Sequence, residues 1–247
     1  MSAIIVVRHA QPADCMDGAA SHWIDTELTP LGRRQAQAVA DRLARELAPA
    51  LERSLALDVG PAPEHGAALE LGPAPRGAPS ARCVLYSSDL RRAAQTAEPI
   101  GRALGVEVVP APGLREFNNG IPSEKAMEDL CKYVGEPTPA TRELLAAPAG
   151  ETWPQFQQRV AGCMERITAG EERLVVVVAH YGAIGIILSW WLGLGLTAAG
   201  DTPVSFEAGL ASIAVLTRRY NKPRIDRVND AAHLREAGLD GHLPLVP

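Results

Sequence analysis

The stretch AIIVVRHAQP, residues 3–12, begins with five apolar residues and then places Arg8 and His9 side by side. An unbroken run of branched apolar residues is typical of a strand buried on both faces, as in parallel sheets. The two polar side chains at its end either cap the strand in solvent or belong to a binding site. The segments that follow the other strands decide between these alternatives.

Strand and helix patterns alternate along the chain. β-branched runs occur at residues 4–7, 83–86, 106–109, 174–179 and 211–216. Helical patterns follow Thr29 and Pro30, and occur at residues 90–104, 153–169 and 183–192. This alternation predicts an α/β protein with three layers, α/β/α, in which a mostly parallel central sheet is flanked by helices. In such sheets, ligands bind beyond the carboxyl ends of the strands.

One segment departs from this pattern. Between residues 48 and 82, nineteen of thirty-five residues are Ala, Pro or Gly. Such a segment has few large apolar groups to offset its ordering entropy, so we expect a mobile surface loop with a short helix around residues 51–57. We therefore interpret residues 1–247 as a single domain that carries a Pro/Ala/Gly-rich insertion.

Composition excludes several classes of protein. The chain is 47% hydrophobic and 21% charged, with a net charge of −5. The mild acidity argues against nucleic-acid binding and a membrane-binding basic face, and the longest apolar stretch, residues 183–196, is too short to span a bilayer. The start of the chain lacks the features of a secretory signal, so we expect a cytoplasmic protein without nucleic-acid or membrane partners. The oligomeric state is left open, with a homodimer as one option.

The absence of four short motifs excludes further kinds of site. The chain has no CxxC pair, no cysteine followed six residues later by arginine, no GxxxxGK[ST] loop and no HExxH motif. The four cysteines are therefore expected to be reduced thiols without a role in metal binding or nucleophilic catalysis. They are Cys15, Cys83, Cys131 and Cys163.

Polar residues follow four of the predicted strands. Arg8 and His9 follow the first, Arg91 and Arg92 lie in the first turn of the helix after the second, Glu116 comes after the third, and His180 follows the apolar run 174–179. Residues 87–89, Ser-Ser-Asp, are expected to cap the helix that carries the arginines. The predicted sheet brings these side chains to one edge.

The residue types at this edge fit phosphoryl transfer. Guanidinium groups and a helix N-terminus match phosphate oxygens. One imidazole can attack phosphorus, a second can hold the transferring phosphoryl group, and a carboxylic acid can protonate the leaving oxygen. This chemistry needs neither a metal ion nor a cofactor. Taken singly, each of these residues is more often a structural or surface residue, and only their combination favours a site.

Six motifs carry a resemblance to a known family. In this order, RHA (8–10), LTPLGRRQA (28–36), SSDLRRAAQTA (87–97), LREFNNG (114–120), GETWPQFQQRV (150–160) and VVAHYG (177–182) resemble the histidine phosphatase superfamily, also called the phosphoglycerate mutase-like family. The resemblance implies a metal-independent phosphatase that hydrolyses a small-molecule phosphomonoester. It assigns the following residues: His9 as the phosphorylated nucleophile, Arg8 and Arg92 as phosphate-binding residues, Glu116 as the general acid and His180 as the second histidine. Arg91 falls on a variable position of the motif.

Three departures from the family pattern concern the substrate. Cys15 occupies a position where some family members have a phosphate-contacting Asn, the segment after Glu116 is unlike that of either familiar branch, and Tyr181 replaces a usual glycine. We favour a phosphatase over a mutase because residues 121–148 leave little room for the mutase insertion. The alternatives are a phosphoglycerate mutase-type enzyme and a non-catalytic phosphate-binding protein.

Overall fold

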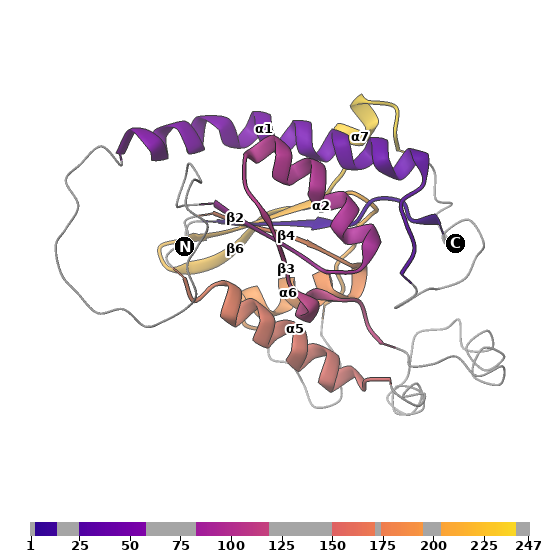
Figure 1. The fold of residues 1–247 in the computed structure, drawn as a ribbon. Helices are drawn as coiled ribbons and strands as arrows, with labels where there is room; N and C mark the ends of the chain where they lie inside the picture. Colours follow the sequence, from indigo (N-terminus) through magenta and orange to yellow (C-terminus); the bar gives the residue numbers. More distant parts are fainter. Residues whose placement is uncertain are drawn as a thin grey trace.

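A six-stranded sheet in the order β3-β2-β4-β1-β5-β6 forms the centre of the fold (Figure 1). The computed structural model describes residues 3–13, 25–57, 83–118, 150–170, 174–194 and 204–240. The strands are β1 (Ala3–Arg8), β2 (Cys83–Ser87), β3 (Val108–Pro110), β4 (Leu174–Ala179), β5 (Ile213–Arg219) and β6 (Lys222–Asp230). The first four are parallel, whereas β5 and β6 pair antiparallel.

Helices cover both faces of the sheet, which confirms the predicted three-layer α/β architecture (Figure 1). One face packs against α1 (Pro30–Leu57), α2 (Arg91–Leu104) and α7 (Ala232–Glu236), and the other against α5 (Trp153–Ile167) and α6 (Tyr181–Leu192). A single 3₁₀ turn, η2 (Pro112–Leu114), follows β3. No helix in the described ranges combines the length and the apolar character needed to cross a membrane.

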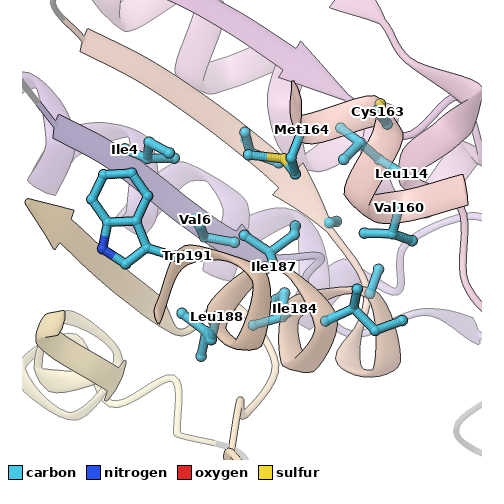
Figure 2. Packing of buried hydrophobic residues seen from close by; sticks show 14 of the residues in the cluster. Ile4, Val6, Leu114, Val160, Cys163, Met164, Ile184, Ile187, Leu188 and Trp191 are labelled. Carbon is cyan, nitrogen blue, oxygen red and sulfur yellow. The ribbon is translucent and has the colours of Figure 1, made fainter. Parts of the chain in front are cut away.

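The central strand β1 is buried because its side chains alternate between two apolar layers. Ile4 and Val6 contact the layer of α5 and α6, as Figure 2 shows, whereas Ile5 and Val7 contact the layer of α1 and α2. All four side chains are at most 3% exposed. Burial on both faces explains why the sequence of β1 is a continuous apolar run without polar alternation.

Several predicted boundaries differ from the structure, including those of the insertion and of the third strand. The expected short helix at residues 51–57 is present, but as the end of α1, so the predicted loop does not begin at residue 48. Residues 58–82, the rest of the predicted insertion, lie outside the described residues. The third strand begins at Val108, two residues later than predicted, because Gly105 ends α2 with φ of 67° and Val106 still donates to the carbonyl of Gly101.

The hairpin of β5 and β6 was not fully predicted. Strand β6 carries six charged or polar residues among nine, a pattern that indicates a loop, yet it pairs with β5 as the edge of the sheet. The two strands are joined by Tyr220 and Asn221, both with positive φ, as a two-residue hairpin turn requires. The short helix α7 was also missed.

The two cysteines in the described residues are buried free thiols. Cys83 and Cys163 are free and buried, and burial raises the pKa of the Cys83 thiol to about 11. Both are therefore protonated at neutral pH, which agrees with the prediction that they have no nucleophilic role. Cys15 and Cys131 lie outside the described residues.

Candidate active site

The ends of β1, β2 and β4 are fixed to one another by backbone hydrogen bonds. The His9 amide donates to the carbonyl of Ala179 at 2.9 Å, and the Ser88 amide donates to the carbonyl of Val178 at 2.9 Å. These bonds continue the parallel register beyond the last strand residues. The residues that follow the three strands, His9, Ser88 and His180, are thereby held at one edge of the sheet.

The His9 imidazole is buried and held in one orientation. Its Nδ1 lies 2.8 Å from the carbonyl oxygen of Ala10, and because a carbonyl can only accept, Nδ1 carries the proton. Nε2 is left with its lone pair. Burial, together with the charges of Arg8 and Arg92, holds the pKa of His9 well below its ordinary value, so the ring is neutral at pH 7.

The backbone beside His9 is attached to helix α2 through Thr96. The Ala10 amide donates to Thr96 Oγ1 at 3.0 Å, and the Thr96 hydroxyl donates to the carbonyl of Arg92 at 2.7 Å. Thr96 and Arg92 are four residues apart and share one face of α2. The Arg92 side chain, only 2% exposed, is thus carried on the same helix turn that supports the His9 loop.

Arg8 is anchored by the turn that precedes β5. Its Nη1 donates to the carbonyl of Ala208 at 2.6 Å, and its amide donates to the carbonyl of Ser212 at 3.1 Å. The guanidinium lies 5.2 Å from the centre of the Tyr181 ring, which is 41% exposed. Tyr181 therefore stands beside a predicted phosphate-binding residue, at the surface end of the site.

His180 is the most enclosed of the predicted site residues. Its ring is fully buried, 5.0 Å from the His9 ring between centroids, and its Nε2 lies 2.8 Å from Ser88 Oγ. Its Nδ1 is buried and has no hydrogen-bond partner among the described residues. Burial, the adjacent His9 ring and the charge of Arg92 hold the pKa of His180 well below its ordinary value.

The Glu116 carboxylate is bound to the beginning of helix α6. Its Oε2 accepts from the Gly182 amide at 3.0 Å, and its Oε1 accepts from the Phe117 amide at 2.9 Å. Gly182 comes two residues after His180, so these bonds bring Glu116 to the strand end that carries the second histidine. A Cβ atom at Gly182 would lie 2.5 Å from Glu116 Oε1, so a larger residue at this position would displace that oxygen.

Arg159 of helix α5 holds the segment that carries Glu116. It donates to the carbonyl oxygens of Gly113, Arg115 and Glu116, each at 3.1 Å. The same guanidinium pairs with both carboxylate oxygens of Glu151, which also accepts from the Asn118 amide. One side chain therefore binds the backbone on both sides of Glu116.

The arrangement brings the five predicted residues together: Arg8, His9, Arg92, Glu116 and His180. It offers a bare imidazole nitrogen, a second buried imidazole, two guanidinium groups and a carboxylate, carried by the strand ends, by helix α2 and by the segment after η2. In the described part of the chain, no three His, Cys, Asp or Glu side chains lie close enough to hold a metal ion together. The site is chemically suited to an oxyanion that accepts hydrogen bonds.

The predicted cap of α2 is wrong in detail. The N-cap residue is Leu90, and no side chain of residues 87–89 caps it; instead Asp25 accepts from the Arg91 amide at 2.6 Å. Ser88 contacts His180, and Asp89 forms an ion pair with Arg115 that lowers the pKa of Asp89. Sequence analysis also missed Ser88, Arg159 and Gly182 as parts of the site, although each lies within a quoted motif.

Comparison with known proteins agrees with this geometry. The family described as "Histidine phosphatase superfamily (branch 1)" matches residues 4–52 and 66–231. Phosphoserine phosphatase 1 of Hydrogenobacter thermophilus is 26% identical, with 98% of this chain and 99% of the relative covered. A metal-independent phosphoserine phosphatase of Arabidopsis thaliana is 25% identical, with 96% and 84% covered.

Among solved structures, a mycobacterial glucosyl-3-phosphoglycerate phosphatase has the same fold, with a TM-score of 0.64 and 23% identity. The comparison covers 93% of this chain and 99% of that one. Because the family match extends over most of the 247 residues, it includes every element that carries a predicted site residue. The chain belongs to the histidine phosphatase superfamily.

Proposed function

We propose that this chain is a metal-independent phosphatase that hydrolyses a small-molecule phosphomonoester through a phosphohistidine on His9. The observation that carries the proposal is the hydrogen bonding of the two buried histidine rings. His9 Nδ1 is occupied by the Ala10 carbonyl, which leaves Nε2 as a nucleophile, and His180 keeps one buried ring nitrogen without a partner among the described residues. Both rings lie in the field of Arg8 and Arg92.

The first half of the reaction forms the phosphoenzyme. His9 Nε2 attacks phosphorus, and the bond between phosphorus and the ester oxygen breaks. Arg8, Arg92 and His180 stabilise the charge on the phosphoryl oxygens. Glu116, as the general acid, transfers a proton to the departing alkoxide.

The second half releases phosphate. Water attacks the phosphohistidine, the bond between His9 and phosphorus breaks, and the water proton passes to Glu116. Inorganic phosphate leaves, and His9 returns to its neutral form. We propose residues 1–247 as one catalytic domain. A cytoplasmic location stays a prediction, and the oligomeric state is open, with a homodimer as one option.

The names of two relatives suggest the first substrate to assay. Both act on phosphoserine according to those names, one of them without a metal ion. O-phosphoserine is therefore the first alkyl phosphate to test, and activity should be unchanged by a chelator. A strict requirement for a divalent ion would contradict the proposed chemistry.

The decisive experiment traps the intermediate. Rapid acid-free quenching of the reaction should give a phosphoenzyme that is labile to acid, and His9→Ala should abolish both the phosphoenzyme and phosphate release. Glu116→Gln should slow alkyl phosphates far more than aryl phosphates, because aryl oxide leaves without a proton. Equal slowing of both substrates would remove Glu116 as the acid.

The same assay separates the alternatives. Transfer of the phosphoryl group between hydroxyls of a glycerate, in preference to release as inorganic phosphate, would identify a mutase. Binding of vanadate without phosphate release from any ester would identify a phosphate-binding protein. Residues 121–148, on which the preference for a phosphatase over a mutase depends, lie outside the described residues.

A further inference from the structure

Ser88 contacts the second histidine and has no role in the mechanism above. Its hydroxyl oxygen lies 2.8 Å from His180 Nε2, and both side chains are fully buried. Its amide is tied to the carbonyl of Val178, two residues before His180. The hydroxyl and the imidazole are therefore held in contact by the register of β2 against β4.

The two ring nitrogens of His180 have different surroundings. Nε2 faces the serine hydroxyl, whereas Nδ1 is buried without a partner among the described residues. A neutral imidazole carries one proton, so one nitrogen donates and the other accepts. Burial and the neighbouring cationic groups keep the ring neutral at pH 7, so the choice of tautomer decides which nitrogen can donate to an anion.

The hydrogen bonds of Ser88 favour one of the two tautomers. The Leu90 amide points to Ser88 Oγ, at 3.4 Å, and uses the oxygen as an acceptor. Among the described residues the Ser88 hydroxyl has no acceptor other than His180 Nε2, so its proton goes to that nitrogen and the ring proton resides on Nδ1. In the opposite tautomer Nε2 would donate to Ser88, and the lone pair of Nδ1 would face an incoming oxyanion.

We propose that Ser88 is a positioning residue that holds His180 as the Nδ1-protonated tautomer, so that the second histidine acts as a neutral hydrogen-bond donor to the phosphoryl group. The proposal rests on the proposed function for the nature of the anion, but its geometry does not depend on turnover. Ser88 thus contributes to oxyanion binding through the His180 imidazole and does not itself contact the substrate.

The test uses the full-length protein labelled with ¹⁵N in its histidine rings. The His180 signals, assigned by comparison with His180→Asn, should show a protonated Nδ1 and a bare Nε2 in the wild type, without ligand and with inorganic vanadate. Ser88→Ala should redistribute the proton toward Nε2. It should also weaken vanadate binding and lower kcat/KM, each about tenfold, as for one hydrogen bond to a charged group.

Ser87→Ala is the matched control. Ser87 is adjacent, 1% exposed, and its hydroxyl donates to the carbonyl of Ser88 and not to an imidazole. This variant should keep the wild-type tautomer and vanadate affinity. A purely structural effect of losing a buried hydroxyl would change both variants alike, and that outcome would overturn the proposal.

Two further outcomes also contradict it. A folded Ser88→Ala protein that keeps the Nδ1 proton and the wild-type vanadate affinity shows that Ser88 does not set the tautomer. If Ser88→Ala does not fold, the wild-type spectrum still decides, because a protonated Nε2 there is incompatible with the proposal. A wild type that has the expected tautomer but forms no phosphoenzyme would reject the proposed function and leave the tautomer assignment intact.

Discussion

Replacing Gly182 by alanine should displace the Glu116 carboxylate while the protein stays folded. The added Cβ would lie 2.5 Å from Glu116 Oε1, whereas ordinary contact begins at 3.4 Å, so the oxygen must move by at least 0.9 Å. The atom that moves most is the end of a flexible side chain, and Phe156 Cε1, at 3.2 Å, has to move by only a few tenths of an ångström, which keeps the cost in stability small. Because a misplacement of about 1 Å costs roughly 100-fold in rate, kcat/KM for an alkyl phosphate should fall about 100-fold.

The assay compares two substrates and two variants. With Gly182→Ala, hydrolysis of phosphoserine should lose about two orders of magnitude, within the range expected for a lost general acid, and hydrolysis of an aryl phosphate should change only a few-fold. Gly185→Ala, on the same helix, meets no atom within 4 Å. It should leave both rates unchanged and raise the free energy of unfolding by about 0.5–1 kcal/mol, as for glycine to alanine in a helix.

Two results would refute this reasoning. If Gly182→Ala hydrolyses alkyl phosphates at the wild-type rate, the position of the Glu116 carboxylate at the start of α6 is not the one used in catalysis. If it slows alkyl and aryl phosphates equally, the added methyl group disturbs phosphate binding and not the acid. A crystal structure of the variant, compared with the wild type, would show which group has moved.

Two further predictions concern the support of the site. Arg159→Lys keeps the charge but loses the guanidinium group that binds three carbonyl oxygens, so it should lower the free energy of unfolding by about 2 kcal/mol in denaturant titrations. Its effect on alkyl phosphate turnover should be less than additive with that of Glu116→Gln. Burial lowers the pKa values of His9, His180 and His233. Below pH 6.5 these histidines are therefore protonated in the unfolded chain but still neutral in the folded protein. Stability should therefore fall as pH drops from about 6.5 to 5, by up to roughly 1.4 kcal/mol per pH unit for each histidine, and unfolding titrations without this slope would contradict the neutral state of the buried rings.

The first five strands, and the edge of the sheet at which the five candidate residues lie, could be predicted because each of these strands has a local signal. Strand β4 is an apolar run of six residues and was predicted to the residue, and His180 is the polar residue that ends it. The edge strand β6 gave no such signal, since its side chains are mostly polar and it is held by pairing with β5. Its assignment depends on a neighbour that local periodicity does not reveal.

The supporting residues could not be predicted for a similar reason. Arg159 lies on an amphipathic helix, where an arginine indicates an exposed face, and its function depends on carbonyls more than forty residues away. Ser88 was interpreted as a helix cap because serine before a helix usually is one. The contact with His180 follows from the parallel register of two strands that are far apart in sequence.

Strand β5 runs antiparallel to β1, so the strand ends along the site present backbone amides at one place and backbone carbonyls at another. Parallel strands lead into helices here, so β4 presents the amide hydrogens at the start of α6, where Gly182 binds the Glu116 carboxylate. β5 runs the other way, and the turn that enters it presents the carbonyl oxygens of Ala208 and Ser212 to Arg8. The end of β4 thus holds a carboxylate through a backbone amide, and the turn before β5 holds a guanidinium group through a backbone carbonyl, a difference that follows from the direction of the two strands.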